Sequence, residues 1–274
     1  GRDYTKFLKA DGLKGARIGI PRAYFYDAVI PPGAKQPQGG LNAEQKRAMD
    51  EVITILKAQG AVIVDPADLP SITSTDPKGN ILLWNGCSGT ANSQSKDEEC
   101  STVLHYGMKR DFNKWLASLG VSAPVKSLTE LREFNLAHRP AGTLKYGQAR
   151  LDFADSLDLD ADRARYESDR ARDLALTAAT GIDAAMRDNR IDALLFPGYS
   201  GNAIAAKPGY PTIAVPFALI ANTSDTPFPA GFNPKPMPYG ISFTGLACSE
   251  PRLIELGYAF EQGTKRRVPP PDLP

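Results

Sequence analysis

Two short segments of this 274-residue chain carry residue types that serine hydrolases use. The first, from Ser93 to Lys96, reads Ser-Gln-Ser-Lys and fits the S-x-x-K pattern, in which a lysine one helical turn from a serine takes its proton. Three acidic residues follow at 97–99 and would keep that lysine protonated, whereas a general base must be neutral. We therefore do not expect this pattern to be catalytic.

The second segment, at 198–202, reads Gly-Tyr-Ser-Gly-Asn. It begins like the turn that exposes the nucleophilic serine of α/β hydrolases, but its second glycine is misplaced and no helix is expected promptly after it. Loops at the carboxyl ends of strands line the ligand crevice of open α/β sheets. We therefore predict that Tyr199, Ser200 and Asn202 line a substrate pocket, with an ordinary turn as the alternative.

The three cysteines are too few for a disulfide framework. Cys87 and Cys100 bracket a polar loop and form either one disulfide or two free thiols. A disulfide would indicate a periplasmic or secreted protein, and free thiols a cytoplasmic one. Cys248 lies in an apolar stretch and is expected to be buried. Because no metal-ligand spacing and no nucleotide-binding glycine pattern is present, we expect neither a metal nor another cofactor.

The charge balance restricts the class of partner. Lys and Arg number 32 against 31 Asp and Glu, a formal net charge of +1, which argues against a nucleic-acid partner. The longest apolar run, from Thr212 to Ala221, is interrupted by Pro216 and is too short to cross a bilayer. We therefore expect neither a nucleic acid nor a membrane as partner.

The elements that must position these residues are typical of an α/β fold. Apolar runs predict strands at 16–20, 61–64, 193–196, 212–215 and 241–244. Between the first two, Asn42 and Gln45 predict a capping box that opens a helix, and Gly60 predicts its end. An uninterrupted apolar run directly after that glycine suits a strand covered on both faces.

Further helices are expected in the middle and at the end of the chain. One apolar helical face is formed by Met108, Phe112, Trp115, Leu116 and Leu119. Ser127 with Glu130 predicts the start of a second helix, a long helix is expected over about 160–189, and a last one begins near Ser249. We also predict a polar loop or insert at 66–101 and a proline-rich loop at 222–239.

Several segments, taken in order, resemble the amidase signature family. They are 3–22, with LKGARIGIPR at its end, RDFNKWL at 110–116, SLTELREFN at 127–135, ALLFP at 193–197, GYPTIAVP at 209–216 and GISFTG at 240–245. The middle segments are similar to bacterial peptide-amidase-like members. The resemblance covers almost the whole chain and implies a mixed β-sheet sandwiched by helices.

Members of this family hydrolyse linear C–N amide bonds with two serines and a lysine from a Gly/Ser-rich core, and no such segment occurs here. The resemblance therefore implies that residues 1–274 are the C-terminal portion of a single amidase-like domain. The chain alone would hold no catalytic residue and would be inactive. We expect it to be paired with the preceding half or poorly soluble, since an open sheet edge and an apolar face would otherwise be exposed.

On this interpretation the substrate is a small amide or peptide amide, bound together with the missing N-terminal half. Phe134 and Gln148 are predicted to lie in the pocket behind the 199–202 segment. Two alternatives remain. The chain could be part of an amidotransferase A-type subunit that works in a complex, or a non-catalytic α/β binding module, because a fold does not by itself confer an activity.

Overall fold

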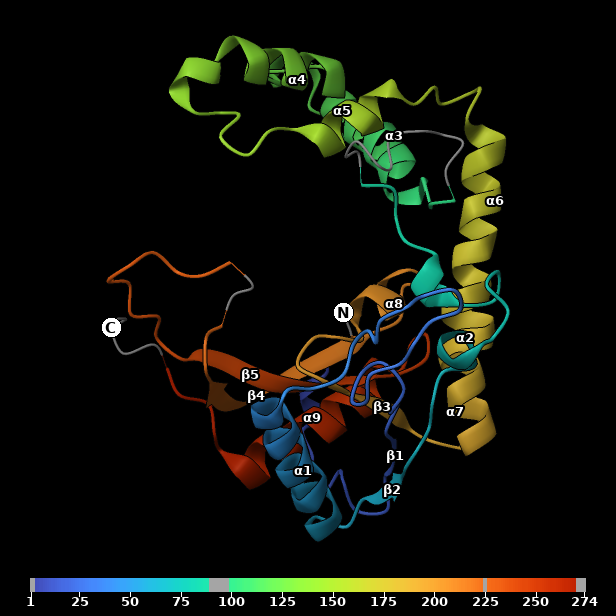
Figure 1. The fold of residues 1–274 in the computed structure, drawn as a ribbon, viewed down its shortest axis with the longest axis vertical. Coiled ribbons are helices and arrows are strands. Elements are labelled where there is room, and N and C mark those ends of the chain that lie inside the picture. Colours follow the sequence, from blue (N-terminus) through green and yellow to red (C-terminus); the bar gives the residue numbers. More distant parts are fainter. Residues whose placement is uncertain (1–2, 89–98, 224–225, 270–274) are drawn as a thin grey trace. The chain divides into compact units, whose positions relative to one another are not determined.

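The computed structural model describes residues 3–88, 99–223 and 226–269, which divide into two compact units (Figure 1). One unit joins Gly1–Asn80 to Ala175–Pro274 and contains the β-sheet. The other unit, Ile81–Leu174, is built from helices. Each unit is described by itself below.

The sheet of the first unit has five strands in the order β2-β1-β3-β5-β4. They are β1 (Arg17–Gly19), β2 (Val62–Val64), β3 (Ala193–Pro197), β4 (Thr212–Ile220) and β5 (Met237–Thr244). β1 is parallel to β2 and β3, whereas β5 is antiparallel to β3 and β4, so the sheet is mixed. All five residues of β3 are buried, as expected for an uninterrupted apolar run at the centre of a sheet.

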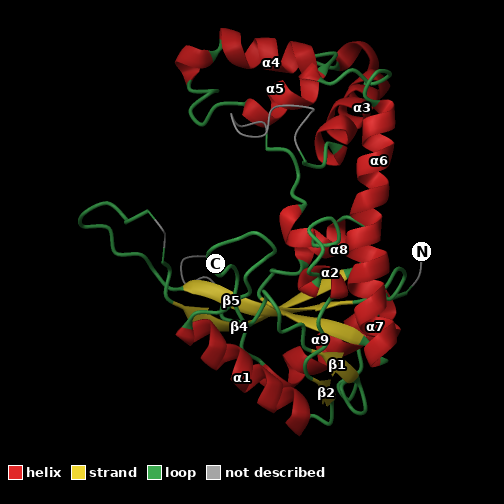
Figure 2. Ribbon diagram, turned by 45° about the vertical axis from the view of Figure 1, so that its right-hand side comes forward, coloured by secondary structure: helices red, strands yellow, loops and turns green. Residues whose placement is uncertain are grey.

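Helices cover both faces of this sheet (Figures 1 and 2). α1 (Ala43–Ala58) and α9 (Glu250–Thr264) lie on one side, and α2 (Pro70–Thr73) and α8 (Asn202–Ala206) lie on the other. The Asn42–Gln45 capping box forms at the start of α1, as predicted. The predicted α/β fold, a mixed sheet sandwiched by helices, is confirmed.

The stretch 160–189 is not the single helix that was predicted. It contains α6 (Arg163–Leu174), a π-helical segment η5 (Ala175–Ile182) and α7 (Asp183–Asn189). Gly181 has non-helical dihedrals (φ −106°, ψ −111°), and the Thr180 hydroxyl donates to the carbonyl of Ala175, five residues earlier. Hydrophobic periodicity does not register such a local widening of the helix.

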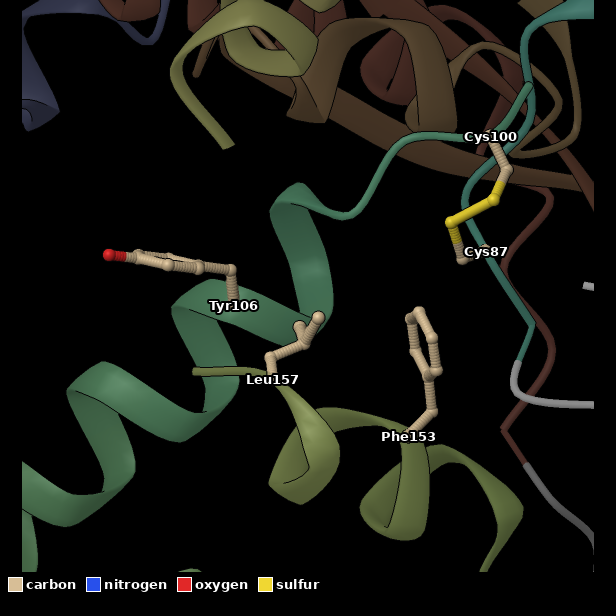
Figure 3. Close-up of a cluster of buried hydrophobic side chains, with 5 residues drawn as sticks. All are labelled: Cys87, Cys100, Tyr106, Phe153 and Leu157. Atoms are coloured by element: carbon tan, nitrogen blue, oxygen red, sulfur yellow. A yellow bond between two sulfur atoms is a disulfide. The ribbon is translucent and has the colours of Figure 1, made fainter. Parts of the chain in front are cut away.

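The second unit contains α3 (Val103–Ser118), α4 (Leu128–Ala137), α5 (Ala149–Ser156) and α6. Cys87 and Cys100 form a disulfide, so of the two alternatives left open by the sequence the structure has the bridge. The disulfide belongs to a buried cluster with Tyr106 of α3, Phe153 of α5 and Leu157 just after α5 (Figure 3). This small core holds α3 and α5 together.

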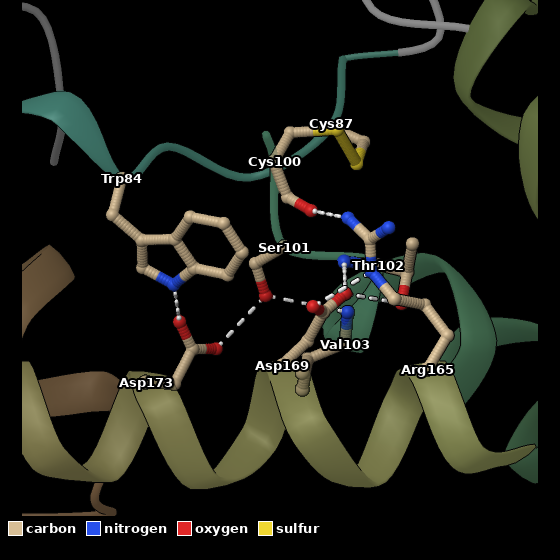
Figure 4. The surroundings of a disulfide bond; sticks show 9 residues. All are labelled: Trp84, Cys87, Cys100, Ser101, Thr102, Val103, Arg165, Asp169 and Asp173. Atoms are coloured by element: carbon tan, nitrogen blue, oxygen red, sulfur yellow. Dashed lines mark hydrogen bonds and ion pairs between the residues drawn. A yellow bond between two sulfur atoms is a disulfide. The ribbon is translucent and has the colours of Figure 1, made fainter. Parts of the chain in front are cut away.

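Buried carboxylates of α6 fix the chain on both sides of the disulfide (Figure 4). Asp173 accepts hydrogen bonds from the Trp84 indole (2.8 Å) and the Ser101 hydroxyl (3.0 Å). Asp169 accepts from both the backbone N–H and the hydroxyl of Thr102 (2.9 and 2.8 Å). Charge-assisted bonds of this kind are about twice as strong as neutral ones, so they anchor this segment independently of the disulfide.

Several expectations about individual segments need correction. Cys248 is exposed, with a positive φ of 62°, because it lies in the turn before α9 and not in a packed strand. On α3, Leu116 is buried, but Trp115 is 54% exposed and Met108 and Leu119 are also exposed. The predicted apolar face of this helix is therefore not covered by the described part of the chain.

The two predicted loops also contain regular structure. The stretch 66–101 includes α2 and a 3₁₀ turn at Ile81–Leu83, and the stretch 222–239 ends in the first residues of β5. Neither α5 nor α8 was predicted, because both are short and weakly amphipathic. The Ser93–Lys96 pattern lies outside the described residues. No helix within the described ranges is both long and apolar enough to span a membrane.

The disulfide leads to a prediction about thiol reactivity. Alkylation of the unreduced, unfolded protein should modify one thiol, on Cys248, whereas alkylation after reduction should modify three. Intact mass measures both numbers, and Cys248→Ser should give none and two. Three modified thiols without reduction would show that the bridge is absent.

A second prediction concerns His105, which is 2% exposed and packs edge-to-face on Phe153 at 4.8 Å. Neither ring nitrogen has a partner among the described residues. Burial, together with the charge of Arg150, lowers the pKa of His105. The unfolded imidazole therefore takes up a proton at a higher pH than the folded one, and stability is lost as the pH falls below about 6.5.

His105→Leu should remove this loss. We expect the free energy of unfolding to fall less between pH 8 and pH 5 in the variant than in the wild type, by up to about 2 kcal/mol. Denaturant unfolding at the two pH values measures the difference. His138→Gln, at an exposed histidine, should retain the wild-type pH dependence. Equal pH dependence of wild type and His105→Leu would contradict the prediction.

Candidate functional site

A cavity of about 560 Å³ lies at the carboxyl end of β3, within the unit that contains the sheet. Its walls come from the 24–25 and 39–41 segments, from residues 197–200 after β3, and from β4 and β5. This volume is in the range that holds a small organic molecule. The position agrees with the predicted crevice at the carboxyl end of a strand.

The turn after β3 forms one wall through close main-chain packing. Gly198 has a positive φ of 55°, and its N–H donates to the carbonyl of Gly240 on β5 (2.9 Å). At Gly201, an added Cβ would lie 2.4 Å from the ring of Phe196, so only glycine fits without a shift. α8 begins at the next residue, and the expectation that no helix follows promptly was therefore wrong.

A second wall depends on two glycines with positive φ, Gly39 (73°) and Gly40 (81°). The N–H of Gly40 donates to the carbonyl of Tyr24 (2.7 Å), and a Cβ at Gly39 would lie 2.2 Å from that same carbonyl oxygen. Glycine is therefore required for the 39–40 backbone to approach Tyr24. This contact places the Tyr24 and Leu41 side of the wall beside β5.

The cavity is apolar and uncharged. None of the described lining residues is Asp, Glu, Lys, Arg or His. Polar side-chain groups among them are the hydroxyls of Tyr24, Tyr199, Ser200 and Tyr239 and the amide of Gln45. Because no described lining residue can act as a base at neutral pH, the Ser200 hydroxyl has no group in this wall to take its proton. The cavity as described can bind a neutral ligand but has no activated nucleophile.

Tyr239 is the most unusual lining residue. Its side chain is 7% exposed, and its hydroxyl has no hydrogen-bond partner in the described part of the chain. Burial raises the pKa of Tyr239 to about 12, so the hydroxyl stays protonated at neutral pH. The buried Tyr26, by contrast, donates to the carbonyl of Leu195 (2.9 Å). No sequence pattern pointed to Tyr239, which falls at the end of the predicted proline-rich loop.

Of the residues predicted to line a pocket, Tyr199 and Ser200 line this cavity. Tyr199 is 75% exposed and therefore lies at the rim. Asn202 is the exposed first residue of α8 and does not belong to the lining. Two of the three predicted residues on this turn are thus brought to one cavity.

Phe134 and Gln148 belong to the Ile81–Leu174 unit. Phe134 is 48% exposed and stacks on His138, with ring centroids 3.9 Å apart. The Gln148 amide oxygen accepts a hydrogen bond from Asn135 (3.1 Å). Their part in a substrate pocket remains a prediction. Within the described ranges, no group of three or more His, Cys, Asp or Glu side chains could hold a metal ion.

The packing of Gly201 against Phe196 predicts the effect of adding one methyl group. Gly201→Ala should lower the free energy of unfolding by about 1–3 kcal/mol, because Phe196 is fully buried and already contacts Phe25 edge-to-face at 4.7 Å. Gly107→Ala, inside α3 with its nearest atom 3.9 Å away, should be neutral or stabilising by up to about 1 kcal/mol. Denaturant unfolding of both variants tests this, and equal stabilities would contradict it.

Comparison with known proteins identifies relatives along nearly the whole chain. A probable amidase of Arabidopsis thaliana is 27% identical over 268 residues, which cover 97% of this chain and 42% of that protein. The A subunit of the glutamyl-tRNA(Gln) amidotransferase of Desulforudis audaxviator is 28% identical over 291 residues, covering 99% of this chain and 49% of that protein. No family model matches the chain.

The solved structure of native peptide amidase from Stenotrophomonas maltophilia superposes with a TM-score of 0.69 at 30% sequence identity. The match covers 98% of this chain and 47% of the peptide amidase. The chain thus spans somewhat less than half the length of these relatives. With its mixed sheet and its amidase relatives, the chain is a homologue of the amidases and has the α/β fold of the amidase signature family.

Proposed function

We propose that this chain is the C-terminal part of an amidase that hydrolyses linear C–N amide bonds, and that it supplies sheet structure and part of the substrate pocket. The main support is the uncharged cavity at the carboxyl end of β3, in a chain that a peptide amidase structure matches over 98% of its length. A neutral cavity suits an amide, which carries no charge and presents one carbonyl acceptor and an N–H donor.

The chemistry must be completed by residues outside this chain. In the mechanism that the family resemblance implies, a serine hydroxyl attacks the amide carbon and passes its proton toward a lysine base. The C–N bond breaks, the amine leaves with a proton, and water hydrolyses the acyl-enzyme to a carboxylate and the free serine. The described cavity wall contains no lysine and no other base, so we assign to it binding and not proton transfer.

Uncovered apolar surface also supports a longer parent molecule. β4 is a nine-residue strand at the edge of the sheet, and its Leu219 is 54% exposed. Trp115 on α3 is exposed to the same extent. Long edge strands and large exposed apolar side chains are usually covered by another part of the protein, because they otherwise promote aggregation.

A kinetic measurement on the longer protein tests the pocket. We expect the gene to encode, in frame before Gly1, a Gly/Ser-rich segment with the two serines and the lysine. In that full-length protein, Tyr199→Ala should raise KM for a peptide amide about five- to tenfold, because an aromatic contact at the cavity rim is lost. Tyr146→Ala, which removes a 91% exposed ring in the other unit, should leave KM unchanged. Unaltered KM values for several amides in Tyr199→Ala would remove this cavity from the substrate site.

An amidotransferase A-type subunit is a second candidate. The relative from Desulforudis audaxviator, which covers 99% of this chain, favours it. Genes for partner subunits beside this one, and amide hydrolysis that appears only when those partners are added, would support this candidate. If no Gly/Ser-rich segment precedes the chain, a non-catalytic binding module becomes the better interpretation.

The disulfide supports a proposal about the compartment. Structural disulfides persist in oxidising environments and are rare in the cytosol. Because Cys87 and Cys100 are 3% and 6% exposed and bonded to each other, we propose a periplasmic or secreted location.

A further inference from the structure

The cavity and the Tyr239 hydroxyl together point to a particular class of ligand. The cavity is surrounded by aromatic rings, those of Tyr24, Phe25, Tyr199 and Tyr239. Tyr24 and Phe25 already pack edge-to-face, with centroids 5.4 Å apart. Aromatic walls of this kind favour an aromatic guest, since ring edges and faces attract each other beyond the simple burial of area.

The Tyr239 hydroxyl is a polar group without a partner among the described residues. A buried hydroxyl that makes no hydrogen bond destabilises the folded chain, and native proteins contain few of them. The residue lines the cavity, and its high pKa keeps the group available as a donor. A ligand with a hydrogen-bond acceptor beside its aromatic group would satisfy this hydroxyl.

The surroundings also exclude a charged ligand group. The described lining residues carry no charge. The nearby guanidinium of Arg22 lies over the Tyr26 ring and is bound in a two-pronged ion pair with Asp65 (2.6 and 2.8 Å), so its charge is already compensated. A carboxylate entering the cavity would lose its hydration without gaining a counter-charge.

We propose that the cavity binds an uncharged aromatic side chain adjacent to the amide that is cut, and that the Tyr239 hydroxyl donates a hydrogen bond to a carbonyl oxygen of the same ligand. This inference rests on the proposed amidase function and names its substrate class, aromatic carboxamides. Tyr239 is in this account a binding residue that sets specificity.

Two tyrosines of the same unit provide a matched pair of variants. Tyr239→Phe removes a buried hydroxyl that has no partner among the described residues, so it should not lower the unfolding temperature. Tyr26→Phe removes a buried hydroxyl that donates to Leu195 and does not line the cavity, so it should lower the unfolding temperature but leave binding unchanged. A purely structural role for Tyr239 would make the two variants behave alike.

The test is a calorimetric titration of the chain and both variants with three probes. The probes are N-acetylphenylalanine amide, its carboxylate analogue N-acetylphenylalanine, and N-acetylglycine amide. We expect the first to bind the wild type most tightly, and the carboxylate and the glycine amide to bind at least about tenfold more weakly. Tyr239→Phe should weaken binding of the aromatic amide about tenfold without lowering the unfolding temperature.

The inference is overturned if the aromatic amide does not bind, if its carboxylate analogue binds equally well, or if Tyr239→Phe binds as tightly as the wild type. Because the titration measures binding without turnover, it separates this inference from the proposed function. A full-length protein that binds the aromatic amide but hydrolyses no amide would refute only the function. A full-length amidase whose KM for the aromatic amide is the same in Tyr239→Phe would refute only the inference.

Discussion

The pairing of β3 with its two neighbours is the constraint on which the sheet-containing unit depends. β3 is parallel to β1 on one side and antiparallel to β5 on the other, and every residue of it is buried. This change of direction lets the chain leave β3 at Pro197 beside the incoming end of β5. The 197–201 turn and the first residues of β5 thus lie together, and the cavity forms between them.

Close backbone contacts, and not polar side chains, shape the site. Glycines at 39, 40, 198 and 201 let main-chain segments and rings approach where any other residue would be strained or would clash. The result is a neutral, largely aromatic cavity with one hydroxyl that has no partner among the described residues. Such a surface can select a substrate by shape and by one hydrogen bond, while the reacting groups come from elsewhere in a longer protein. Separating binding from chemistry in this way is consistent with a chain that covers less than half the length of its relatives.

Sequence patterns were sufficient where local rules decide the structure. The Asn42 capping box formed as predicted, and each predicted strand has a counterpart in the sheet. β4 and β5 are longer than predicted because their prolines were interpreted as loop residues. Pro216 is tolerated on an edge strand, next to a bulge, and Pro238 lies beyond the last β3 pair at Ile241, so the missing N–H breaks no ladder on that side. Tyr239 could not be predicted, because its burial depends on contacts between segments far apart in the sequence.

The central claim is that this chain contributes to binding and holds no acylated residue. Treating the chain and the full-length protein with a fluorophosphonate, which modifies activated serines, and then measuring intact and peptide masses tests this claim most directly. We predict no adduct on the chain alone and one adduct on the full-length protein, on a serine before Gly1. An adduct on any serine within residues 1–274 would contradict the account.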